Sequence, residues 1–137
     1  MERNLHAKIS SWVRQARHRA RRYKCICRLD LSAALRLVED SNCKCTYCDQ
    51  PCCGLDHAFP LSDKAPNVLA NTVPICQVCK AQKKQQDLVA YHETGHISND
   101  RYLAVLRWML SHDGAVEMRE HLKKITGIGL DSIGCSS

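Results

Sequence analysis

The sequence of 137 residues is poor in long apolar runs. None of its uncharged stretches approaches the roughly 20 residues that a membrane-spanning helix needs. No apolar block follows the basic N-terminus, as it would in a secretory signal. The chain also has no internal repeat and no low-complexity segment. These absences predict an intracellular protein, in the cytoplasm or nucleoid, that has no membrane as a partner.

Cysteine, by contrast, is abundant. The chain has 10 cysteines, and apolar residues make up 45% of it, which excludes wholesale disorder and provides for one modest core. So many cysteines indicate a disulfide scaffold, a metal site or both. Because no secretory signal directs the chain to an oxidising compartment, a metal site is the favoured interpretation.

Positive charge is concentrated near the N-terminus. Residues 1–28 hold nine basic residues and one acidic residue, whereas the whole chain has a net charge of +6. An apolar stripe at helical spacing runs through the same segment, at Leu5, Ile9, Trp12, Ala16 and Ala20. A basic helix on a nearly neutral body is typical of phosphate-binding proteins, although it also suits a solvated surface helix or an organellar address. The candidate nucleic-acid contacts are Arg14, Arg17, Arg21 and Arg22.

Further helices are predicted downstream. One covers about residues 32–39, capped by Ser32, and one runs from about Gln77 to His92 and stops near Gly95. Another begins at Ser98 or Asn99 and ends near Gly114, and a last short helix covers 117–125 before a frayed tail at 129–137. These patterns divide the chain into a basic helical region at 1–40, a cysteine-rich core at 41–95 and a helical extension at 96–137.

Two cysteine pairs of equal spacing, Cys45-x2-Cys48 and Cys76-x2-Cys79, form the strongest short signal. A two-residue gap in a tight turn lets both sulfurs reach one ion about 2.3 Å away, and two such pairs complete a tetrahedral zinc site. Because the protein would fill all four positions, this zinc would be structural. The residues between the pairs exceed a simple zinc ribbon, so the metal would close the base of a larger loop.

The six cysteines outside these pairs are Cys25, Cys27, Cys43, Cys52, Cys53 and Cys135. The favoured interpretation is that they act as small buried hydrophobic side chains. Cys43 is the best candidate to replace Cys45 as a ligand. A second zinc that uses some of them with His92 or His96 is disfavoured, because Gly95 interrupts the helix that such a pair would need.

The loop between the cysteine pairs carries a further ordered motif. Asp56-His57 is followed by Pro60-Leu61-Ser62, and a segment from Asn67 to Asn71 is followed by Val73-Pro74. Together with the cysteine pairs, this combination over about residues 43–84 resembles the zinc-bound HNH endonucleases, which are ββα-metal nucleases. The resemblance extends more weakly upstream, since small phage members also have a basic arm and a helix before the first pair.

The resemblance implies a role for each of three residues. His57 would deprotonate the attacking water, because imidazole has a suitable intrinsic pKa. Asp56 would hold Mg²⁺ or Mn²⁺, for which carboxylate oxygen is a suitable ligand. Asn71 would hydrogen-bond near His57 and orient its ring. Since neighbouring side chains on a strand face opposite ways, the strand must end or distort at Asp56-His57 for both to serve one site.

The sequence departs from the family at Lys80, directly after the last zinc cysteine. The family usually has His or Asn there, which completes the metal site, whereas a protonated lysine has no lone pair to offer. Either Lys80 neutralises the scissile phosphate, or Gln77 or another oxygen replaces the ligand, or the site has lost catalysis and kept nucleic-acid binding. Lys83 and Lys84, one turn further on, are predicted to point along the nucleic-acid groove.

These patterns predict an α+β fold: a small ββα-metal core held by a four-cysteine zinc site and flanked by N- and C-terminal helices. The predicted function is metal-dependent hydrolysis of phosphodiester bonds in DNA, with structural Zn²⁺ and catalytic Mg²⁺ or Mn²⁺. Cutting both strands with one site per chain would favour a homodimer or sequential nicks. The alternative is a catalytically degenerate zinc module that binds nucleic acid or a protein partner. A redox-active cysteine protein is disfavoured, since the Cys-x2-Cys pairs lack a βαβ context.

Overall fold

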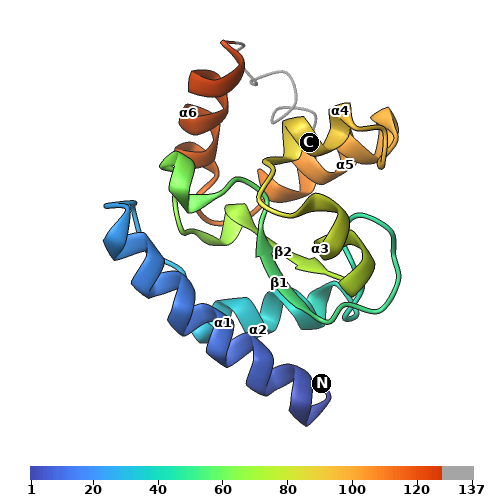
Figure 1. Ribbon diagram of the computed structural model, residues 1–137. Helices are drawn as coiled ribbons and strands as arrows, with labels where there is room; N and C mark the ends of the chain where they lie inside the picture. Colours follow the sequence, from blue (N-terminus) through green and yellow to red (C-terminus); the bar gives the residue numbers. More distant parts are fainter. Residues whose placement is uncertain (128–137) are drawn as a thin grey trace.

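The computed structural model describes residues 1–127, which form a mixed α+β arrangement of helices around one small sheet (Figure 1). The α+β class predicted from the sequence is confirmed. The helices are α1 (Arg3–Arg22), α2 (Leu31–Asp40), α3 (Gln77–Lys83), α4 (Leu88–Glu93), α5 (Asn99–Met109) and α6 (Ala115–Thr126). Within these residues, no helix combines the length and the apolar character needed to cross a membrane.

The sheet consists of two antiparallel strands, β1 (Gly54–His57) and β2 (Thr72–Ile75). Gly54 pairs with Ile75 at one end of the sheet, and His57 pairs with Thr72 at the other. Both strands are largely buried, because α1 packs against β1 and α2 packs against β2. Short 3₁₀ turns at Leu61–Asp63 and Leu69–Asn71 shape the long loop between the strands. α3 follows β2 after a single residue, so the order is strand, strand, helix.

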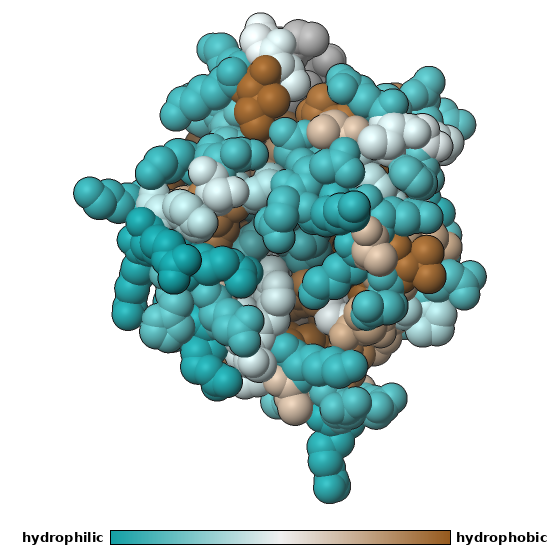
Figure 2. Space-filling view, viewed as in Figure 1, coloured by the Kyte–Doolittle hydropathy of each residue, from teal (hydrophilic) through white to brown (hydrophobic). Residues whose placement is uncertain are grey.

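α1 is an amphipathic helix that forms part of the packed body. Ile9, Val13, Ala16 and Ala20 are buried at spacings of three or four residues, which places them on one face. Ile9 and Val13 belong to an apolar cluster with α2 and with Leu55 of β1. The predicted apolar stripe is confirmed, and its side chains pack α1 against α2 and β1. The opposite face is hydrophilic, and Figure 2 shows the most hydrophilic side chains gathered over α1.

Some helix boundaries differ from the prediction. Asp30, not Ser32, caps α2: its Oδ1 accepts a hydrogen bond from Ala33 N at 2.7 Å. The single helix predicted over 77–92 is divided into α3 and α4. The chain leaves α3 at Lys84, which has a φ of +54°, and Asp87 caps α4 by accepting a hydrogen bond from Ala90 N. Neither glycine nor proline marks this break, so the sequence pattern concealed it.

The C-terminal helices cover the larger apolar core, which also includes the loop residues Phe59 and Val68. Ser98 caps α5 as predicted, but α5 ends at Met109, well before Gly114. Gly114 has a φ of +93° and starts α6, and a Cβ at this position would collide with the Val68 side chain. Glycine therefore meets both a backbone and a packing requirement here. The predicted frayed tail at 129–137, with Cys135, lies outside the described residues.

Candidate metal centre and adjoining cleft

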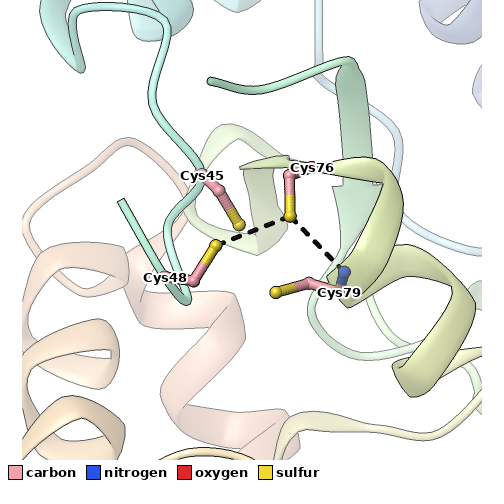
Figure 3. A group of neighbouring side chains, drawn as sticks. All are labelled: Cys45, Cys48, Cys76 and Cys79. Carbon is pink, nitrogen blue, oxygen red and sulfur yellow. Dashed lines mark hydrogen bonds between the residues drawn. The ribbon is translucent and has the colours of Figure 1, made fainter. Parts of the chain in front are cut away.

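The four cysteines of the predicted zinc site come together from two segments of the chain (Figure 3). Cys45 and Cys48 lie in a tight turn, in which the Cys45 N–H donates to Gln50 O at 2.6 Å. Cys76 lies between β2 and α3 and caps α3, and Cys79 lies in the first turn of that helix. A turn and a helix N-terminus thus contribute two sulfurs each.

The geometry of the cluster suits one metal ion. All four sulfur atoms lie within 4.8 Å of one another, and Cys48 Sγ lies 3.5 Å from Cys76 Sγ. Sulfurs around a tetrahedral zinc are about 3.8 Å apart, since each Zn–S bond is about 2.3 Å long. Thiolates are soft ligands that select zinc over magnesium or calcium. The donor set is therefore compatible with the predicted structural zinc.

The surroundings shift the pKa values of the cluster's thiols in opposite directions. Burial raises the pKa of Cys45 to about 11 and raises the pKa of Cys79 further still. Burial also opposes ionisation of Cys76, but hydrogen bonds from the Cys79 N–H and the neighbouring thiols outweigh it and lower the Cys76 pKa to about 7. Four crowded thiols with opposed pKa values need a cation among them in order to ionise together.

The other cysteines within residues 1–127 do not join this cluster. Cys43 and Cys52 pack against the smaller apolar core beside α2, so Cys43 does not replace Cys45. His92 stacks on Tyr102 with ring centroids 4.1 Å apart. His96 stacks on Tyr91 of α4, so the two histidines contact different aromatic rings.

A cleft of about 240 Å³ opens between α1, the end of β1 and α3. Asp56 and His57 line it from β1, Trp12 and Arg19 from α1, and Lys80 from α3. β1 ends at His57, which is where the sequence required the strand to end if both residues are to face one site. Because Lys80 directly follows Cys79, the cysteine cluster and the cleft share the first turn of α3.

Asp56 forms an ion pair with Lys83, a buried lysine of the cleft lining. Lys83 Nζ lies 2.9 Å from Asp56 Oδ2 and donates a second hydrogen bond to His57 O at 3.1 Å. The side chain of Lys83 is 1% exposed, and that of Asp56 is 22% exposed. Lys83 also lines the cleft, but its side chain lies on the inner face of α3, toward β1, where its ammonium group is paired with Asp56. Asp56 Oδ1 accepts no hydrogen bond from any residue between 1 and 127.

His57 is buried and held by two side chains. It is 6% exposed, its Nε2 lies 2.8 Å from Asn67 Oδ1, and its ring centroid lies 4.6 Å from that of Trp12. Burial lowers the pKa of His57 to about 4; it outweighs the hydrogen bond to Asn67 Oδ1, which acts in the opposite direction, and Arg19 adds to the decrease. The imidazole is therefore neutral at pH 7. With Nε2–H donating to Asn67, the lone pair is on Nδ1.

Asn71 acts on the loop backbone and does not hydrogen-bond to His57. Its Oδ1 accepts from Phe59 N at 2.9 Å, and its Nδ2 donates to Phe59 O at 2.8 Å and to Pro66 O at 3.0 Å. The resemblance assigned the orientation of the His57 ring to Asn71, whereas the structure gives that contact to Asn67. Asn71 instead fixes the loop in which Asn67 lies.

The remaining predicted contacts separate into two groups. Lys80 and Lys84 are exposed and line the cleft, whereas Gln77 does not line it. The four predicted arginines are exposed on the outer side of α1, away from the cleft lining; they are Arg14, Arg17, Arg21 and Arg22. The sequence did not distinguish Arg19 from these, because only the packing of α1 on β1 decides which arginine faces inward. Trp12 was likewise assigned to the apolar stripe and not to the cleft.

The cleft offers a divalent ion one carboxylate group, from Asp56. Magnesium is commonly bound by one or two carboxylates together with substrate phosphates and water, so a single carboxylate oxygen is compatible with such an ion. The ammonium group of Lys83, 2.9 Å from Oδ2, weakens this attraction. Lys80 brings a further positive charge to the same cleft. Asp56 Oδ1 is thus the oxygen of this carboxylate that would be open to an ion.

Comparisons of the chain with protein-family models, with curated proteins and with solved structures find no match. A functional assignment for the cleft therefore rests on its own residues.

Proposed function

We propose that this protein is an HNH-type, ββα-metal endonuclease that hydrolyses phosphodiester bonds in DNA. The observation that carries the proposal is the cleft in which Asp56 and the neutral His57 meet four cationic side chains, those of Arg19, Lys80, Lys83 and Lys84. Phosphodiester hydrolysis needs a base for the attacking water and positive charge around the phosphate. The order of β1, β2 and α3, with two cysteines of the cluster at the start of α3, supports the ββα-metal assignment.

Each residue of the cleft takes one task. His57 accepts the proton of the attacking water at Nδ1, because its Nε2 is engaged with Asn67. Lys80 binds a non-bridging oxygen of the scissile phosphate from its exposed place on α3. Asp56 would hold Mg²⁺ or Mn²⁺ through Oδ1, and such an ion would neutralise charge on the phosphate. Lys83 fixes the carboxylate from below.

The outer face of α1 supplies affinity for the phosphate backbone. Arg14, Arg17 and Arg21 are exposed and recur at three- and four-residue spacing, so they form a ridge along the helix. Contacts of this kind are independent of base sequence and sensitive to salt. Because α1 is packed on β1, the ridge has a fixed place on the protein, on the face of α1 that points away from the cleft lining.

Plasmid nicking with and without Mg²⁺ or Mn²⁺ tests the proposal. We expect His57→Ala to lower the nicking rate by about 10²–10⁴, the usual effect of removing a positioned base. The matched control is His18→Ala, which removes an exposed histidine of α1 that does not line the cleft. Equal nicking by wild type and His57→Ala would place any activity elsewhere and reject the proposal.

One observation favours a second candidate, a zinc module that binds nucleic acid without cleaving it. Lys83 already neutralises Asp56, and Lys80 stands where the family has a metal ligand. Lys80→Asn separates the two candidates by the sign of its effect. If Lys80 binds the scissile phosphate, the change lowers nicking. If the site has lost catalysis, the change raises the affinity for Mn²⁺ and creates or increases nicking.

A further inference from the structure

A chain of hydrogen bonds leads from the surface of the protein to His57. Cys27 Sγ lies 3.4 Å from Asn67 Nδ2, and Asn67 Oδ1 lies 2.8 Å from His57 Nε2. Cys27 is exposed, whereas Asn67 is 1% exposed and His57 is 6% exposed. The thiol is therefore the outer end of a path whose inner end is the proposed base.

The backbone of Asn67 is fixed by the segment that contains Cys27. The Asn67 N–H donates to Ile26 O at 2.8 Å, and Asn67 O accepts from Arg28 N at 3.0 Å and from Leu29 N at 3.1 Å. Residues 27 and 67 also form an isolated parallel bridge. Only the rotation of the Asn67 amide remains to be set, and the side chains on either side of it must set it.

The direction of that amide determines which nitrogen of His57 carries the proton. With Oδ1 toward the ring, Nε2 must be the donor and Nδ1 keeps its lone pair. If the amide were reversed, its NH₂ group would face Nε2, and the ring proton would move to Nδ1. A thiol sulfur that accepts from Nδ2 holds the amide in the first direction.

We infer that Cys27 and Asn67 form a positioning relay that fixes the Nε2–H tautomer of His57 and leaves Nδ1 free toward the cleft. The tautomer itself does not depend on the function proposed above, although its use in catalysis rests on that function. Neither residue touches a substrate, so both are positioning residues.

The relay is tested by imidazole ¹⁵N NMR on the full-length, zinc-loaded protein at pH 7, which reports the protonated nitrogen without any substrate. We expect wild type to show His57 protonated at Nε2. Cys27→Ala should give a mixture of tautomers, whereas Cys27→Ser, which keeps an acceptor, should retain the wild-type signal. The matched control is Cys25→Ala, since the Cys25 thiol donates to Leu61 O and takes no part in the relay.

A second variant separates the two halves of the relay. In Asn67→Asp the carboxylate accepts from Nε2–H without help from residue 27, so Asn67→Asp with Cys27→Ala should show the Nε2–H tautomer again. In nicking assays, Cys27→Ala should lower kcat about tenfold, the lower end of the range for outer positioning groups, with little change in KM. Rescue of the tautomer by Asn67→Asp is an effect that a merely structural role of Cys27 would not produce.

The outcomes distinguish this inference from the proposed function. Protonation of wild-type His57 at Nδ1, or an unchanged tautomer in Cys27→Ala, overturns the relay even if the protein cleaves DNA. The expected tautomers in a protein that does not nick DNA leave the relay standing and reject the nuclease. The expected tautomers with a kcat effect support both.

Discussion

The cysteine cluster and the cleft both use the first turn of α3, but they are built in different ways. The cluster draws its four side chains from two short motifs, each with a fixed spacing. The cleft draws its lining from α1, β1, the loop after β1 and α3, which are joined only by packing. Local geometry therefore determines the cluster, whereas the cleft depends on how distant segments meet. Substitutions in the cluster should therefore abolish folding. Substitutions in the cleft should instead change stability or activity by smaller, varying amounts.

The largest effect is expected at the cluster. Cys76→Ser should abolish zinc binding and cooperative unfolding, since the binding energy of a structural zinc, about 10–16 kcal/mol in small zinc peptides, is largely folding energy. Zinc content and thermal melting monitored by circular dichroism measure this. Cys53→Ser is the control, because Cys53 lies outside the cluster. A cooperative melt that is unchanged by Cys76→Ser or by chelation would show that the cluster is not a structural metal site.

At the floor of the cleft, Asp56→Ala should destabilise the fold as well as impair activity. The change leaves the Lys83 ammonium buried without a counter-charge, which typically costs about 3–5 kcal/mol of unfolding free energy. Urea denaturation measures it, and Asp63→Ala, at an exposed carboxylate in the loop after β1, should change it by less than about 0.5 kcal/mol. Asp56→Ala combined with Lys83→Met should recover most of the loss. No recovery would mean that the buried charge is not the cause.

The buried His57 predicts a pH dependence of stability. Its pKa is about 4 in the folded protein, against 6.5 for the unperturbed side chain, so the unfolded chain binds more protons between these values. Stability contributed by neutral His57 is thus complete above pH 6.5 and declines as the pH falls toward 4. Between pH 7 and pH 5 the loss should be about 2 kcal/mol. His57→Gln should flatten the profile by this amount, and His18→Gln should not. Equal profiles would indicate that His57 titrates normally.

The smallest effect is expected on the outer face of α1. Replacing Arg14, Arg17 and Arg21 together by alanine should leave the melting temperature nearly unchanged, since all three are exposed. It should reduce the slope of log Kd against log salt for DNA by about 0.9 for each phosphate that the protein no longer neutralises. Arg107→Ala, at an exposed arginine of α5, is the control. An unchanged slope would mean that these three arginines do not contact the DNA phosphates.

The contrast between the two regions also explains what the sequence could predict. The α+β class, the cysteine cluster and the end of β1 at His57 follow from local patterns: Cys-x2-Cys spacing, helical periodicity and strand alternation. Several details of the cleft did not follow: the inward position of Lys83, the contact of Asn67 with His57, and the places of Arg19 and Trp12 in the lining. The sequence around Lys83 is the same whether its side chain faces solvent or Asp56, and only the tertiary contacts of Lys83 with the end of β1 turn it inward.

The exchange of roles between the two asparagines has a similar cause. Asn67 and Asn71 belong to one short segment, and their spacing does not tell which side chain reaches the His57 ring. The choice is made by the segment around Cys27, forty residues earlier in the chain, which fixes the backbone of Asn67. The division of 77–92 into α3 and α4 was equally hidden, because Lys84 adopts a positive φ where glycine or asparagine is usual.

The direct succession of Cys79 and Lys80 has a consequence for how this protein can evolve. The Lys80 N–H donates to Cys76 O at 3.0 Å, so the backbone at position 80 is anchored by the cysteine cluster, while the side chain is exposed. An exchange of Lys80 for another side chain therefore leaves the core packing intact and takes away no ligand of the cluster. A single codon change at this position alters the charge and the ligating capacity of the cleft at little cost to the fold. The packing of the core and the charge of the cleft thereby depend on adjacent residues and can be selected independently.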